Sequence, residues 1–153
     1  MKLPIGDSPR PADDLWAPEI SVEELELATP AALTDAFPKF AWNVDELWRV
    51  NRPARNHPVT DFDWLMSLPL WRWRGQRFVL APAQVLADRN TYRAHVDKAW
   101  AADLSYPVHV TFHNERWVIL DGYHRLLKAH LLGVRTIPAV EVTPADLAKE
   151  NIP

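Results

Sequence analysis

The fold is decided by one stretch, Trp117-Val118-Ile119-Leu120-Asp121-Gly122-Tyr123-His124-Arg125. Its first four residues are apolar and typical of a short buried strand, and an Asp-Gly pair is typical of a turn. From Tyr123 to Leu131 the apolar residues recur every three or four positions, which predicts one face of a helix, and Gly133 is a natural end for it. The stretch therefore predicts a strand, a tight turn and a helix in direct succession.

The turn of this motif is suited to binding an anion. A helix N-terminus offers unpaired N–H groups and a partial positive charge, and Gly122 lets a ligand approach the backbone closely. The cationic side chains of His124 and Arg125 are unfavourable in a first helical turn unless an anion is present, and the arginine fork matches phosphate or carboxylate groups. Asp121 could hold Mg²⁺ or receive a proton. The alternative is that Asp121 only caps the helix.

The residues around the motif predict a small mixed sheet. Alternation from Pro107 to His113 predicts a strand, and Asn114-Glu115 can close a hairpin onto the motif strand. Further strands are expected over Gln76 to Leu80 and over Ile137 to Val142. Short helices are expected over residues 82–86 and 91–102 and after a cap at residues 143–146.

The first half of the chain is predicted to be helical. Cap patterns at Ser21, Thr29, Asn43 and Thr60 precede four short helices, and the polar stretch from Arg52 to Pro58 is predicted to be a connector. We therefore expect a flexible tail over residues 1–18, a helical N-terminal extension over residues 19–75 and an α/β (α+β) domain over residues 76–153.

The totals exclude several classes of protein. The 153 residues carry a net charge of −3, which disfavours nucleic acid as a partner, and they contain no cysteine, which excludes disulfides and thiolate chemistry. No apolar run approaches the roughly 20 residues of a membrane span, and the first residues lack the apolar core of a signal peptide. We expect a cytoplasmic protein without a membrane partner.

Two other groups of residues invite a functional interpretation. His109 and His113 share one face of a strand but would lie about 13 Å apart, too far for one metal ion, so exposed strand histidines are expected. Trp71-Arg72-Trp73-Arg74 could stack bases or a sugar, but a strand with packed tryptophans and solvated arginines is the commoner arrangement.

Residues 107–142 resemble the core motif of the ParB/sulfiredoxin superfamily. The resemblance consists of a strand that begins at a proline, a hairpin, the Gly-x-x-Arg turn from Gly122 to Arg125, Leu132-Gly133 and Ile137-Pro138. It implies a small mixed sheet of ParB/sulfiredoxin type, and it does not cover residues 1–75.

The turn separates the functions within this superfamily. Sulfiredoxins carry a catalytic cysteine where this chain has Tyr123, so their chemistry is excluded. Chromosome-partitioning ParB proteins carry a further arginine where this chain has His124, bind CTP and continue into a DNA-binding domain, for which the eleven residues after Val142 leave no room. The Asp-Gly-x-His-Arg form looks more like the free-serine kinases.

That resemblance implies roles for individual residues. Asp121 would serve phosphoryl transfer and hold Mg²⁺, while Gly122, Tyr123, His124 and Arg125 would bind the phosphates of ATP, ADP or CTP. The kinases also use a glutamate base that is missing here, and Asp88, the nearest acid, is the candidate for that catalytic role. Ser105 lies in the loop before the strand that starts at Pro107; relatives contact ligand from this loop, so Ser105 is a candidate ligand-binding residue.

The expected function is a nucleotide-dependent phosphotransferase, or kinase, that acts on a small hydroxyl-bearing molecule. The alternative is a non-catalytic nucleotide-binding or protein-interaction module, with residues 1–75 contacting a protein partner. A ParB-like nuclease is least supported, because the acidic residues form no evident two-metal cluster.

Overall fold

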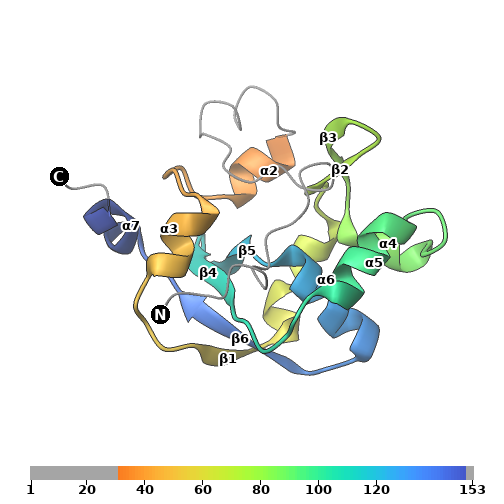
Figure 1. Cartoon of the computed structure of the whole chain (residues 1–153). Coiled ribbons are helices and arrows are strands. Elements are labelled where there is room, and N and C mark those ends of the chain that lie inside the picture. Colours follow the sequence, from red (N-terminus) through yellow and green to blue (C-terminus); the bar gives the residue numbers. More distant parts are fainter. Residues whose placement is uncertain (1–30, 151–153) are drawn as a thin grey trace.

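The centre of the molecule is a four-stranded mixed sheet with the strand order β1-β6-β4-β5 (Figure 1). Strand β4 runs parallel to β6, whereas the β1–β6 and β4–β5 pairs are antiparallel. A two-stranded hairpin, β2-β3, forms a second sheet. The computed structural model describes residues 31–150, with the side chains of residues 31–147. The strands are β1 (Arg55–Pro58), β2 (Trp71–Trp73), β3 (Gln76–Leu80), β4 (Val108–His113), β5 (Arg116–Asp121) and β6 (Thr136–Glu141).

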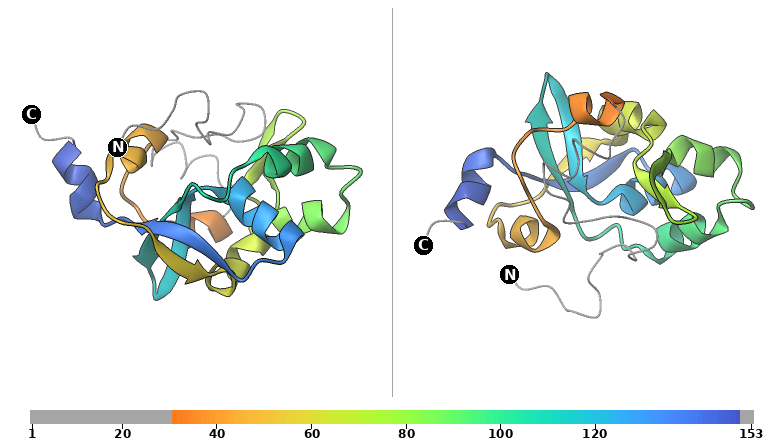
Figure 2. Two further views of the ribbon diagram at one scale, coloured as in Figure 1. Left: turned by 60° about the horizontal axis from the view of Figure 1, so that its bottom comes forward. Right: turned by 90° about the horizontal axis from the view of Figure 1, so that it is seen from above.

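Short helices surround the larger sheet. Helices α4, α5 and α6 pack on one another, while α3 and α7 lie together at the opposite end of the sheet (Figures 1 and 2). The helices are α2 (Ala31–Ala36), α3 (Val44–Arg49), the 3₁₀ helix η2 (Val59–Ser67), α4 (Pro82–Ala87), α5 (Arg93–Ala101), α6 (Tyr123–Leu132) and α7 (Pro144–Glu150). The mixed α/β class expected from the sequence is thus confirmed.

Local signals in the sequence placed several elements correctly. The strand-turn-helix motif forms β5 and α6, and Gly133 ends α6 in the left-handed conformation at φ +71°. Asn114 and Glu115 close the β4–β5 hairpin with φ values of +52° and +64°. Asn43 caps α3, because its side chain accepts a hydrogen bond from the Glu46 amide at 2.9 Å. The predicted caps at Ser21 and Thr29 lie outside the described residues.

The prediction of a connector from Arg52 to Pro58 was wrong in its second half. Residues 55–58 form strand β1 at the edge of the sheet, with His57 opposite Ile137 of β6. An edge strand tolerates Pro58, and the buried His57 ring is held by Glu141 at 2.9 Å. The helix expected after Thr60 exists, but it begins at Val59 and is a 3₁₀ helix.

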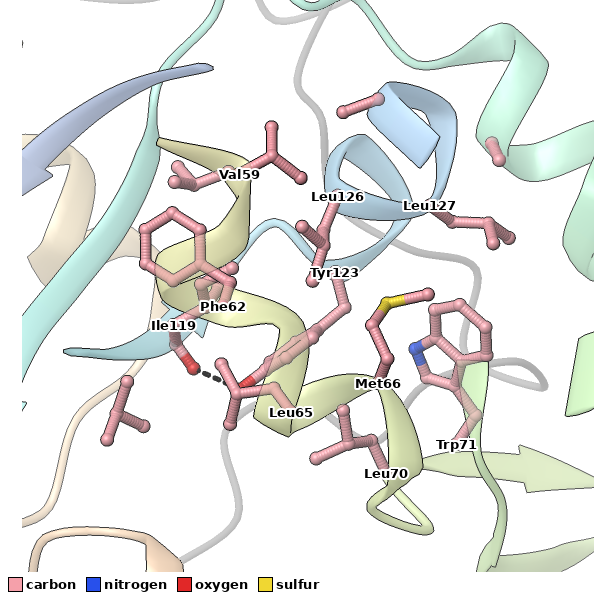
Figure 3. Close-up of a cluster of buried hydrophobic side chains, with 14 of the residues drawn as sticks. Val59, Phe62, Leu65, Met66, Leu70, Trp71, Ile119, Tyr123, Leu126 and Leu127 are labelled. Atoms are coloured by element: carbon pink, nitrogen blue, oxygen red, sulfur yellow. Dashed lines mark hydrogen bonds between the residues drawn. The ribbon is translucent and has the colours of Figure 1, made fainter. Parts of the chain in front are cut away.

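The main core joins both halves of the sequence. Helix η2 inserts Phe62 and Leu65, both fully buried, into the same hydrophobic cluster as Leu126 and Leu127 of α6 (Figure 3). Residues on both sides of position 75 therefore share this core, as they share the larger sheet through β1. The first half of the described chain is packed into the α/β structure.

The outer edge of β5 is covered by aromatic hydrogen-bond donors. The Trp64 indole donates to the Trp117 carbonyl at 3.1 Å, and the Trp42 indole donates to the Leu120 carbonyl at 3.3 Å. The Tyr123 hydroxyl donates to the Ile119 carbonyl at 2.6 Å (Figure 3). Three carbonyls of this edge strand are thus satisfied by side chains.

Candidate functional site

The turn between β5 and α6 requires glycine. Gly122 has φ +120°, a conformation that side chains with a Cβ rarely adopt. A Cβ there would lie 2.5 Å from Val108 Cγ1 and 2.8 Å from Arg125 Nη2. The close approach of strand β4, the turn and the Arg125 side chain therefore depends on the absence of a side chain at this position.

A buried ion pair joins the two sides of the turn. Arg125 Nη2 lies 3.3 Å from Asp121 Oδ2, and the two residues are 2% and 1% exposed. The alternative role of Asp121 as the helix cap does not apply, because Gly122 occupies the capping position of α6. The Asp121 side chain pairs with Arg125 instead. Burial lowers the pKa of Arg125, and the negative charges of Asp121 and Asp103 oppose that change.

The Arg125 guanidinium is only partly satisfied. Its Nε and Nη1 atoms are buried and have no hydrogen-bond partner in the described part of the chain. A buried charged group that lacks acceptors costs free energy, and an oxyanion would supply them. The side chain is therefore suited to an anionic ligand.

Trp48 of helix α3 covers this ion pair. Its indole Nε1 donates to Asp121 Oδ2 at 3.3 Å, and the Arg125 Cζ atom lies 5.5 Å from the centre of its ring. Helix α3 is held in place by Leu47, which is fully buried in a second hydrophobic cluster with residues of β5, β6 and α7. The N-terminal half of the chain therefore contributes a residue to the site, which the sequence motif gave no reason to expect.

His109 also belongs to this neighbourhood, and the expectation that it is exposed was wrong. Its ring packs edge-on against Trp48 at a centroid distance of 4.5 Å, and the residue is 2% exposed. Burial, helped by the charge of Arg125, lowers its pKa to about 3, and its Nδ1 atom has no partner among the described residues. Alternation along β4 could not reveal this burial, because the covering side chain comes from α3, some 60 residues earlier in the sequence.

His124 occupies a different environment from Arg125. Its Nε2 atom is 3.0 Å from Nδ1 of His95, and both rings stack on the buried Trp71 indole. Burial lowers the pKa of His124 well below its usual value, with the charges of nearby basic groups adding to the effect. A neutral imidazole brings no charge to a phosphate, so the geometry gives His124 a role in packing α6 against α5 and β2.

Tyr123 points into the core. It is 3% exposed, and its hydroxyl donates a hydrogen bond to the Ile119 carbonyl (Figure 3). Burial raises its pKa well above the usual value of tyrosine. Of the predicted turn residues, Asp121, Gly122 and Arg125 are thus brought together, whereas the Tyr123 and His124 side chains pack elsewhere.

Ser105 lies in the loop that leads to β4. Its amide and hydroxyl both donate to Asp103 Oδ1, at 2.8 and 2.7 Å, and these bonds lower the pKa of Asp103. Asp103 in turn acts electrostatically on Arg125. Ser105 is exposed, and the described contacts join it to Asp103 but not to Asp121 or Arg125.

Asp88 lies at the end of α4 and is exposed. Its carboxylate accepts hydrogen bonds from the amide and the hydroxyl of Thr91, at 3.2 and 2.8 Å. No described contact joins it to Asp121 or Arg125, and these bonds give it a local role in starting the turn before α5.

The residues do not fit a metal site made by the protein alone. Among the side chains of residues 31–147, no group of three or more His, Asp and Glu could hold a metal ion. Asp121 Oδ2 already accepts from Arg125 and Trp48, two donors that a cation would have to displace.

The tryptophan-arginine run at β2 is largely used in packing. Trp71 is fully buried between the helices, and Trp73 packs edge-on against Tyr92 at 5.1 Å. Trp71 is therefore not available to stack on a base or a sugar.

Comparisons with known proteins leave the family of this chain open. No protein-family model, curated protein or solved structure matches it. Within residues 31–150, none of the helices combines the length and the apolar character needed to traverse a bilayer.

Proposed function

We propose that this chain is a domain of ParB/sulfiredoxin type that binds a nucleotide, with the phosphates at the Asp121–Arg125 turn. The observation that carries the proposal is the buried Arg125 side chain, whose Nε and Nη1 atoms lack acceptors among the described residues. A phosphate supplies several strong acceptor oxygens and a negative charge, and Gly122 leaves the backbone of the turn without a side chain in the way.

Phosphoryl transfer to a small hydroxyl-bearing molecule is the second candidate function. It is favoured by the Asp121 carboxylate, which is in contact with the same arginine that would hold the phosphates. In that reaction the acceptor oxygen bonds to the terminal phosphorus, the bond to the bridging oxygen breaks, and the hydroxyl proton leaves to a carboxylate or to water. Transfer ranks second because His124 is buried in packing and Asp88 has no described contact with Asp121 or Arg125, so neither supplies the group that the reaction needs.

Thermal stabilisation by ATP, ADP, CTP and GTP, each with and without Mg²⁺, tests the binding function. A ligand present at 100 times its Kd stabilises the native state by about 2.7 kcal/mol. Arg125→Lys keeps the positive charge but removes the planar fork, so we expect it to weaken binding at least about tenfold. The matched control is Arg93→Lys at an exposed arginine of α5, which should bind as the wild type does. Equal stabilisation of the wild type and Arg125→Lys would refute the phosphate site.

A separate assay tests transfer. If the wild type binds ATP, formation of ADP with small hydroxyl compounds should depend on Asp121, and Asp121→Asn should abolish it while leaving ADP binding measurable. Binding without any turnover would leave the nucleotide-binding module as the function.

A further inference from the structure

The position of Trp48 implies that the phosphate site is closed in this structure. The indole donates to the same Asp121 oxygen that pairs with Arg125, and its ring lies over the guanidinium. Trp48 is itself partly exposed, whereas Asp121 and Arg125 are almost completely buried. The indole is thus a barrier between the ion pair and the surface of the molecule.

The closed arrangement leaves Arg125 short of partners. The face of an aromatic ring attracts a cation but accepts no hydrogen bond from Nε or Nη1, and those two atoms remain without acceptors among the described residues. His109, which packs edge-on against the Trp48 ring, also has a buried Nδ1 atom without a partner among the described residues. A ligand with oxyanion oxygens would satisfy groups that the indole cannot.

Helix α3 has the properties of an element that can move. It has only six residues, of which Val44 and Leu47 are buried, and Leu47 lies in the smaller of the two hydrophobic clusters. The following residues 51–54 are exposed and have no regular structure. Few buried contacts and an exposed connection are the features that allow local opening at a low cost in free energy.

We propose that Trp48 is a gate over the Arg125 site, and that an anion reaches the guanidinium only when the indole moves away. The anion is the phosphate of a nucleotide if the proposed function holds, on which this part of the inference rests. In the closed state the indole covers the guanidinium of Arg125, where the anion would bind. Removal of the indole should therefore expose Arg125 and increase the affinity for phosphates.

Chemical labelling of arginine tests the gate without any ligand. Phenylglyoxal modifies accessible guanidinium groups, and mass spectrometry of peptides gives the rate for each arginine. We expect Arg125 to react slowly in the wild type, at least tenfold faster in Trp48→Ala, and at an intermediate rate in Trp48→Phe, which keeps a ring but loses the N–H donor. Trp100→Ala is the matched control, since Trp100 is an exposed tryptophan of α5. Arg116 and Arg93 are exposed in the folded protein, so they control for the activity of the reagent and should react equally in all four proteins.

Titration of the same proteins with ADP completes the experiment. Tighter binding by Trp48→Ala together with faster labelling supports the gate. Equal labelling of Arg125 in the wild type and both Trp48 variants overturns it, even if ADP binds and the proposed function stands. Faster labelling with no ADP binding by any protein supports the gate and refutes the nucleotide. Weaker ADP binding by Trp48→Ala overturns the gate, because Trp48 would then be a contact for the ligand.

Discussion

The imidazoles of His95 and His124 share a hydrogen bond of 3.0 Å inside the protein, and both rings lie nearly parallel to the Trp71 indole. His95 also bonds the Arg72 carbonyl at 3.1 Å, so the pair connects α6 and α5 to the β2–β3 hairpin. Two protonated rings at this distance would repel each other in a site from which water is excluded.

Stability should therefore fall in mild acid. The pKa of His124 is held well below its usual value and that of His109 is about 3, whereas an unfolded histidine has a pKa near 6.5. Below about pH 6.5 these histidines bind protons in the unfolded chain but not in the native state. The free energy of unfolding therefore decreases as the pH falls towards 3. Each such histidine contributes up to about 1.4 kcal/mol per pH unit.

Urea unfolding between pH 4 and pH 8 measures this effect. His109→Phe keeps an aromatic ring against Trp48 but cannot titrate, so its stability should fall less steeply below pH 6 than that of the wild type. Above pH 7.5 the two pH dependences should coincide. Identical slopes in acid would show that His109 titrates normally in the native state.

Loss of one member of the buried ion pair should be costly. Arg125→Ala leaves the Asp121 carboxylate buried and unpaired by its cation, and we expect the free energy of unfolding to fall by about 3–5 kcal/mol. The double variant Asp121→Leu/Arg125→Met, which replaces both charges by apolar groups, should lose much less than the sum of the two single variants. Additive losses in urea unfolding would mean that the two side chains are energetically independent.

The glycines at the two ends of α6, Gly122 and Gly133, both have positive φ and allow a comparison. Gly122→Ala combines backbone strain with a Cβ only 2.5 Å from Val108 Cγ1, and we expect it to lose about 3 kcal/mol of stability. Gly133→Ala carries less strain, because φ +71° lies in the left-handed region, and it meets no atom within 4 Å, so about 1 kcal/mol is expected. Equal losses from the two substitutions would argue against the close approach of β4 to the turn.

The N-cap of helix α3, which carries Trp48, can be removed without changing Trp48 itself. Asn43→Ala deletes the acceptor of the Glu46 amide and should cost about 1 kcal/mol. If α3 opens as a unit, Arg125 should also become more reactive towards phenylglyoxal in this variant. Asn51→Ala, at an exposed position beyond the helix, is the control and should change neither quantity.

The sequence predicted the elements that depend on local signals and missed those that depend on distant contacts. The strand-turn-helix motif, the Asn114-Glu115 hairpin and the Asn43 cap all follow from residues within a few positions of one another. Strand β1 carries no such signal, because its pairing with β6 joins residues some 80 positions apart.

The same distinction holds for the candidate site. Asp121, Gly122 and Arg125 were predicted from the turn itself, and the structure brings them together. Trp48 and His109 were missed, because packing between α3 and β4 is invisible to the periodicity of either element. The sequence also predicted that His124, as a residue of the same turn, binds the phosphates. Its ring instead stacks on Trp71, which does not support that role.

The aromatic donors along β5 have a consequence for how these molecules meet one another. An open edge strand is a template on which a second chain can extend the sheet, but here the carbonyls of Trp117, Ile119 and Leu120 are already occupied. The opposite edge, β1, is four residues long and contains Pro58, which has no amide hydrogen to offer. Both edge strands of the sheet are thus poor starting points for intermolecular β-pairing. The native protein should therefore resist fibril formation even at high concentration.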